Sequence, residues 1–191
     1  AVGIGSGKWH ELAPSNSVCS HKLKNHCRKT TPMAQHIATI TWNRGTDDFL
    51  DKRYHRVHTW QFDGGATVAA SSSPHVVPLP YSDAAAVDPE EAYVAALSSC
   101  HMLWFMDFAS RAGYRLNSYA DAAVGTMAKN AQGQLVVTHV QLRPVTRFDG
   151  AHAPSAAQLD DLHHRAHTSC FLANSVKTQI DCAPVLEVDG A

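Results

Sequence analysis

Apolar and polar positions alternate over the first part of the chain in a way that predicts three short strands. Residues 36–43, HIATITWN, are rich in β-branched and aromatic side chains. In residues 54–62 the two-residue period of a strand places five side chains on one face: Tyr54, Arg56, His58, Trp60 and Phe62. The turn 63–65 and the run 66–70 predict the return strand of a hairpin. Residues 71–87, rich in serine and proline, are expected to form a surface loop.

The clearest helix signal in the sequence begins at Asp88. Asp88 is a favourable N-cap, Pro89 suits the first helical position, and Glu91 completes a capping box. Residues 92–112 are apolar on nearly every side, and Gly113 ends the run. Because a helix that is buried on all sides needs other elements around it, we expect a sheet to wrap this one.

The remaining segments alternate between strand-like and helix-like patterns. Two long strands are predicted at 116–127 and 135–148, with a hairpin turn between them. Ser155 and Gln158 form a second capping box, which opens a helix to about His167. One or two helical turns at 171–177 and a last strand at 178–187 complete the pattern. This order of elements predicts an α+β protein whose sheet encloses a central helix.

Residues 1–32 stand apart from this pattern. They show neither a helical nor a strand period, and they contain no apolar segment of the kind that a signal peptide has. We interpret residues 1–32 as a tail or upstream sequence and 33–191 as a single domain, with a natural start at Met33. Cys19 and Cys27, which lie in this tail, are assigned no catalytic role.

Charge and composition exclude several classes of protein. Lys and Arg total 16 against 17 Asp and Glu, so there is no basic surplus for nucleic acid or an anionic membrane. The longest apolar stretch, 92–109, is interrupted by His101 and Asp107, which favours a core helix over a membrane span. Five scattered cysteines do not make a disulfide framework, so we expect a reducing, cytoplasmic environment.

Cys100 lies in the middle of the predicted buried helix. A free cysteine there is most often a small core residue. Its neighbours Ser98, Ser99 and His101 are polar, however, and polar atoms are rarely buried without partners. We therefore expect a polar group to meet Cys100.

Three further residues are candidates for chemistry. Cys170 follows Thr168 and Ser169, either of which can cap a short helix, and a thiol at a helix N-terminus is expected to have a lowered pKa. Arg56 on an aromatic strand face requires a carboxylate or thiolate partner, unless it stacks on Trp60 at a sheet edge. Glu90 in the first helical turn is explained by the helix dipole alone.

Metal binding is the second interpretation. His163, His167 and Cys170 are spaced to share one helical face, and Cys100 and His101 supply further possible ligands. The chain has no Cys-x-x-Cys or His-Glu-x-x-His spacing, which weakens this interpretation, and no metal ligand is assigned. A hydrolase or transferase with Cys100 as nucleophile and a distant histidine as base comes third.

Three separated motifs resemble the OsmC/Ohr superfamily of thiol-dependent peroxidases. They are RVHTW at 56–60 with FDGG at 62–65, the stretch 88–101, and the stretch 163–178 around Cys170. The resemblance extends from about residue 36 to the C-terminus, and the motifs resemble the OsmC-like branch more than the organic hydroperoxide resistance branch.

The resemblance implies antiparallel sheets wrapped around long central helices, and two chains that intertwine with active sites at the dimer interface. It implies that Cys100 is the peroxidatic and Cys170 the resolving cysteine, and that Arg56 and Glu90 together hold the Cys100 thiolate and orient the peroxide. An organic hydroperoxide is then reduced to an alcohol through a sulfenic acid on Cys100 and a disulfide between Cys100 and Cys170, without a cofactor. A lipoylated protein or a small dithiol is the implied reductant.

Several details of this sequence bear on that implied mechanism. Glu90 and Cys100 are about 15 Å apart along a straight helix, so we expect Arg56 to bridge them. A break in the helix between Glu91 and Ser98, or a contact across the dimer, is the alternative. Phe171 stands where many members have proline after the resolving cysteine, and Cys182 is interpreted as a simple buried or edge thiol. Apolar side chains are expected to favour an alkyl hydroperoxide over hydrogen peroxide; these are Trp60, Met102, Trp104 and Phe105. A redox sensor or a small-molecule binder without turnover remains the alternative.

Overall fold

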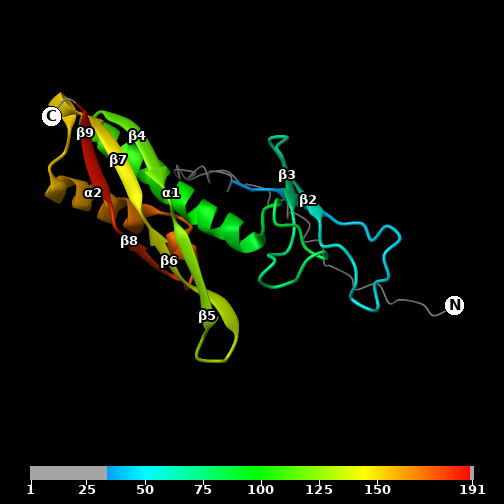
Figure 1. Cartoon of the computed structure of the whole chain (residues 1–191). Coiled ribbons are helices and arrows are strands. Elements are labelled where there is room, and N and C mark those ends of the chain that lie inside the picture. Colours follow the sequence, from blue (N-terminus) through cyan, green and yellow to red (C-terminus); the bar gives the residue numbers. More distant parts are fainter. Residues whose placement is uncertain (1–33, 190–191) are drawn as a thin grey trace, which may run out of the picture. The chain divides into compact units, whose positions relative to one another are not determined.

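The computed structural model describes residues 34–189, and its elements follow the predicted order (Figure 1). The strands and α-helices are β1 (Ala38–Thr41), β2 (His58–Phe62), β3 (Thr67–Ala70), α1 (Pro89–Arg111), β4 (Leu116–Asp121), β5 (Val124–Lys129), β6 (Leu135–Leu142), β7 (Pro144–Asp149), α2 (Ala156–Ser169), β8 (Gln179–Cys182) and β9 (Val185–Asp189). Two short 3-10 turns, η1 (Gly150–His152) and η2 (Ala173–Ser175), flank α2. The predicted α+β class is confirmed.

The start of α1 is the predicted capping box. The Glu91 backbone N–H donates to the Asp88 carboxylate at 2.7 Å, and the Asp88 N–H donates to the Glu91 carboxylate at 3.2 Å. Pro89 occupies the first helical position, where no hydrogen bond is lost. Gly113 follows the end of the helix with φ of +82°, a conformation that glycine adopts without strain.

We expect Asp88→Ala to lower the free energy of unfolding by about 1 kcal/mol, because it removes the acceptor for the Glu91 N–H. Denaturant unfolding followed by circular dichroism measures this change. Asp63→Ala, at an exposed turn position, is the matched control and should leave stability almost unchanged. If Asp88→Ala and Asp63→Ala had the same free energy of unfolding, the capping box would not contribute to stability.

Each of the three predicted long strands is bent into two halves. β4 continues into β5, β6 into β7, and β8 into β9, and the breaks lie at the same level: Asp121 pairs with Pro144, and Leu142 pairs with Cys182. The Asp121 carboxylate accepts the Arg143 N–H at 2.7 Å, which gives the backbone a partner at the break. The halves therefore form two sheets, β4-β7-β9 and β5-β6-β8.

The expectation of purely antiparallel sheets is wrong. β8 runs parallel to β6, with Val140 opposite Ile180, and β9 runs parallel to β7, with Thr146 opposite Leu186. The reason is the connection: parallel strands need a crossover, and α2 supplies one between β7 and β8.

Strands β6 and β7, each the middle strand of its sheet, bury one face against the helices. Alternate residues are buried, as the two-residue period of a strand requires: Val140, Leu142, Pro144, Thr146 and Phe148. Phe148 packs in one apolar cluster with Phe105 of α1 and Leu162 of α2. Val140 and Leu142 pack in a second cluster with Leu97.

Within one chain α1 is covered on a single face, which differs from the expected burial on all sides. The buried residues recur every fourth position: Leu97, His101, Phe105 and Ala109. Leu103 remains 60% exposed and Met106 42% exposed. The strands of one chain reach only one face of the helix, so the other apolar face is uncovered in the single chain.

The first three strands form a separate antiparallel sheet in the order β1-β2-β3. Ile40 lies opposite Trp60, and Trp60 lies opposite Val68, as the hairpin prediction requires. The strand predicted from residue 54 begins only at His58, so Tyr54 and Arg56 belong to the preceding loop. No helix within residues 34–189 has the length and apolar character needed to cross a bilayer.

Candidate active site

Two cysteines meet where the middle of α1 passes the end of α2. Cys100 is half-buried, and Cys170 is 1% exposed. The Cys100 and Cys170 thiols share a hydrogen bond, and burial together with this bond raises the pKa of the Cys170 thiol to about 11. The polar group expected beside Cys100 is therefore the second cysteine. Both thiols are free.

The expected position of Cys170 at a helix N-terminus, with a lowered pKa, is wrong. Cys170 follows the last residue of α2 as its C-cap, because Thr168 hydrogen-bonds back to the His164 carbonyl and remains in that helix. The Ala173 N–H donates to the Cys170 sulfur at 3.4 Å and lowers its pKa, but burial and Cys100 outweigh this donor. At neutral pH Cys170 is consequently a protonated thiol in the reduced protein.

An apolar pocket of about 490 Å³ opens beside Cys100. Its other lining residues are Ala96, Ser99, Leu103, Trp104, Phe171 and Leu172. The Phe171 ring is 70% exposed and meets Trp104 edge-on, with ring centroids 5.4 Å apart. The pocket has the size and character to hold an alkyl or aryl group next to the sulfur.

The pocket contains only part of the apolar set expected from the sequence. Trp104 lines it, whereas Met102 lines a different pocket and Phe105 is fully buried in the core. Trp60 lies in β2, where its indole N–H donates to His58 at 2.8 Å. Leu103, Phe171 and Leu172 were not predicted; helical spacing from Cys100 was the signal available for Leu103.

The side-chain hydrogen bonds of Arg56 stay within its own loop, while its backbone N–H donates to the Tyr81 carbonyl at 3.0 Å. Its guanidinium donates to the carbonyls of Lys52 and Tyr54 and lies over the Tyr54 ring, 3.9 Å from the centroid. Among residues 34–189 no ion pair joins it to Glu90, and it stacks on Tyr54 rather than on Trp60. A single chain thus does not bring Arg56 to the two cysteines.

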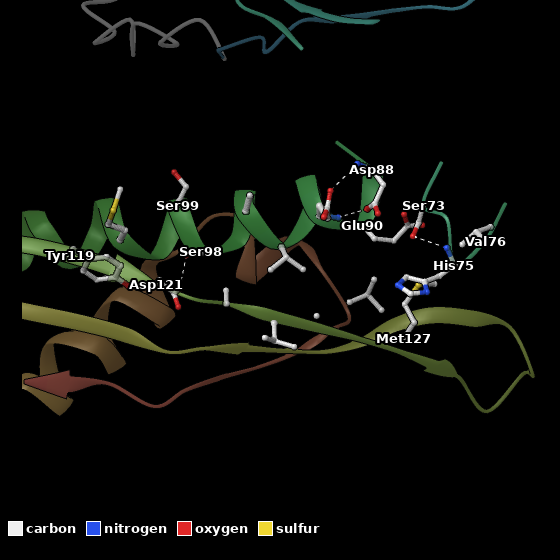
Figure 2. A pocket seen from close by; sticks show the side chains of 18 residues that line it. Ser73, His75, Val76, Asp88, Glu90, Ser98, Ser99, Tyr119, Asp121 and Met127 are labelled. Atoms are coloured by element: carbon white, nitrogen blue, oxygen red, sulfur yellow. Dashed lines mark hydrogen bonds between the residues drawn. The ribbon is translucent and has the colours of Figure 1, made fainter. Parts of the chain in front are cut away.

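Glu90 lines a larger pocket of about 900 Å³ at the N-terminal end of α1 (Figure 2). Ser73 and His75 lie beside it there, and Ser98 at the other end donates to Asp121 at 2.5 Å. α1 is continuous from Pro89 to Arg111, so Glu90 stays about 15 Å from Cys100 along the helix. Ser99 lines both pockets.

A second cysteine-containing cluster lies in the core. His101 Nε2 and His163 Nδ1 are 3.0 Å apart, and the Cys182 sulfur is 4.0 and 3.7 Å from them. Burial lowers the pKa of His101 to about 4 and that of His163 to about 3, and it raises the pKa of Cys182 to about 12. Among the described residues this is the set that satisfies metal-ligand spacing, in place of the expected His163, His167 and Cys170.

Comparison with known proteins agrees with this architecture. A family model described as OsmC-like protein matches residues 82–184, which include Glu90, Cys100, Cys170 and Cys182. No curated protein matches the sequence.

Several solved structures have the same fold. An OsmC-like protein of unknown function from Vibrio cholerae is 51% identical, with a TM-score of 0.79 over 80% of this chain and 100% of its own. An OsmC-like protein from Mycoplasma pneumoniae is 13% identical, with a TM-score of 0.61 over 81% of this chain and 98% of its own. An organic hydroperoxide resistance protein from Elizabethkingia anophelis is 13% identical, with a TM-score of 0.58 over 82% of this chain and 98% of its own. By sequence and by fold, the chain belongs to the OsmC-like family.

Proposed function

We propose that this protein is a thiol-dependent peroxidase that reduces organic hydroperoxides to alcohols. The observation that carries the proposal is the contact between Cys100 and Cys170 beside an apolar pocket. Structural neighbours from Elizabethkingia anophelis and Bacillus subtilis are organic hydroperoxide resistance proteins, which supports the same class of substrate. The pocket supplies apolar surface for the organic group.

In the first step the Cys100 thiolate attacks the distal oxygen of the hydroperoxide. The O–O bond breaks, the alkoxide takes a proton and leaves as the alcohol, and Cys100 becomes a sulfenic acid. The organic group lies in the pocket formed with Trp104 and Phe171 while the reacting oxygen faces the sulfur. Placing the two reactants in this way lowers the entropic part of the barrier.

In the second step Cys170 condenses with the sulfenic acid. The Cys100 charge and hydrogen bond both raise the pKa of Cys170 in the reduced protein. The charge contribution disappears once Cys100 is a neutral sulfenic acid, so the Cys170 proton is released more easily at that stage. The Cys170 thiolate attacks the Cys100 sulfur, water leaves, and a disulfide forms. Oxidation of the first thiol thereby activates the second.

A dithiol completes the cycle. Its first thiolate attacks the disulfide, its second releases the protein thiols, and it leaves oxidised. A lipoylated protein or a small dithiol fits this role because its chain is apolar, as the pocket is. Such recycling needs a reducing compartment, for which we propose the cytoplasm.

The remaining part of the proposal is a homodimer in which Arg56 and Glu90 complete the site. The uncovered face of α1, with Leu103 and Met106, and the exposed strand β1 offer apolar surface to a second copy. The dimer would bring an Arg56 guanidinium to the Cys100 thiolate, where its fork can donate to the sulfur and to a peroxide oxygen. Glu90 would orient that guanidinium through an ion pair.

The test is consumption of cumene hydroperoxide with excess dihydrolipoamide. We expect many turnovers per chain, slower consumption of hydrogen peroxide, and a Cys100–Cys170 disulfide detected by peptide mass spectrometry when the dithiol is withheld. A single turnover despite excess dithiol would favour a redox sensor. No consumption and no disulfide would overturn the proposal.

A further inference from the structure

The polar cluster in the core is not used by the proposed peroxidase. His101 comes from α1, His163 from α2 and Cys182 from the end of β8. The two histidines are 1% and 3% exposed, and Phe105 stacks on His163 with ring centroids 4.2 Å apart. Titratable side chains at such depth are uncommon, because burial of polar groups costs free energy unless they are well paired.

The distances within the cluster are those of a metal site. Zinc binds nitrogen at about 2.0–2.1 Å and thiolate at about 2.3 Å, which places tetrahedral ligand atoms about 3.3 Å (N···N) and 3.6 Å (N···S) apart. The observed separations are 3.0 Å between the nitrogens and 3.7 and 4.0 Å to the sulfur. All three ligand atoms are therefore within a few tenths of an ångström of the required triangle.

One hydrogen bond joins the imidazole rings of His101 and His163. Their planes differ by 7° and their centroids are 5.3 Å apart, so the two nitrogens face each other along a line. The outer nitrogens, His101 Nδ1 and His163 Nε2, are buried and have no hydrogen-bond partner among residues 34–189. Each outer nitrogen is therefore free to carry the ring N–H when the inner nitrogen binds an ion.

We propose that His101 Nε2, His163 Nδ1 and Cys182 Sγ bind one thiophilic transition-metal ion, Cu⁺ or Zn²⁺. Each ring turns away from the line between the two inner nitrogens so that both nitrogens face the ion, and the shared proton moves so that each ring carries its N–H on the outer nitrogen. The Cys182 thiol loses its proton, and one proton is released per ion bound. Three ligands favour Cu⁺, whereas Zn²⁺ normally takes a fourth.

The experiment measures metal content and not peroxidase activity, so its outcome is independent of the proposed function. Cys19→Ser with Cys27→Ser in the 191-residue chain leaves three thiols, Cys100, Cys170 and Cys182. This reduced protein is loaded anaerobically with Cu⁺ or Zn²⁺, and bound metal is determined by elemental analysis. We expect one ion and one released proton per chain, and a higher melting temperature with metal.

Cys182→Ser in this background should bind the ion at least tenfold more weakly, whereas Cys100→Ser and Cys170→Ser should bind it unchanged. Circular dichroism shows whether each variant is folded, and Cys182→Ala provides a second replacement if serine disturbs the core. With Co²⁺ as a probe, thiolate-to-metal charge-transfer absorption should be lost in the Cys182 variants alone. Binding that survives in a folded Cys182 variant, binding that is lost in Cys100→Ser, or no binding at all would overturn the proposal.

Discussion

Cys100→Ser is expected to lower peroxide turnover at least about a thousandfold, because serine cannot supply the attacking thiolate at neutral pH. Cys170→Ser should react once with cumene hydroperoxide and then stop, because nothing condenses with the Cys100 sulfenic acid. The contact between the two thiols is the basis of both expectations. Turnover is followed by peroxide consumption, and the sulfenic acid is trapped with dimedone and located by mass spectrometry.

The matched control for these two variants is Cys182→Ser. Cys182 is the third free thiol of the described residues, and it lies beside His101 and His163 instead of the apolar pocket. Its replacement should leave turnover unchanged. Turnover by Cys100→Ser at the wild-type rate would remove Cys100 as the nucleophile, and full turnover by Cys170→Ser would remove Cys170 as the resolving residue.

The metal-free protein is expected to lose stability steeply as the pH falls from 7 to 4. Burial holds the pKa of His101 at about 4 and that of His163 at about 3, below the usual 6.5. Between pH 6.5 and about 4 the unfolded chain binds protons that the folded chain excludes, so the free energy of unfolding decreases as the pH falls. Each ring contributes a loss on the order of 3 kcal/mol at pH 4, a large share of the stability of a typical domain.

Denaturant unfolding at several pH values measures this effect as a slope. His163→Gln should lower the slope between pH 4 and 6 by up to about 1.4 kcal/mol per pH unit, the equivalent of one proton. His164→Gln, which changes the exposed neighbour on the same helix, is the control and should keep the wild-type slope. If His163→Gln kept the same slope of unfolding free energy against pH as the wild type, the prediction would be contradicted. His163 would then be protonated alike in the folded and unfolded chains.

Local signals predicted much of the fold. The capping boxes at Asp88 and Ser155 were identified correctly because a cap depends on residues three positions apart. The bends in the long strands were not predicted, since they depend on contacts between distant segments: Asp121 binds both Ser98 of α1 and the Arg143 N–H. No periodicity along one strand contains that information.

The same difference between local signals and contacts of distant segments applies to the candidate site. Cys100 and Cys170 were selected from the sequence, but their contact depends on how α1 and α2 pack, and the same packing makes Cys170 a buried C-cap with a raised pKa. The metal interpretation from the sequence named His163 and His101 as possible ligands but not Cys182, because Cys182 lies on a third element and no local spacing links it to the two histidines. The roles of Arg56 and Glu90 stay predictions, because one chain does not bring them to the cysteines.

The position of the histidine pair has a consequence for how the interior behaves as a whole. On α1, His101 stands between Leu97, which belongs to one apolar cluster, and Phe105, which belongs to the other. The strands bend close to His101, because Cys182, whose sulfur is 4.0 Å from His101 Nε2, pairs with Leu142 at the end of β6. The interior thus consists of two small apolar clusters with the polar group of His101, His163 and Cys182 between them. Two substitutions in different clusters share few contacts, so their effects on the free energy of unfolding add, whereas two substitutions within one cluster are coupled.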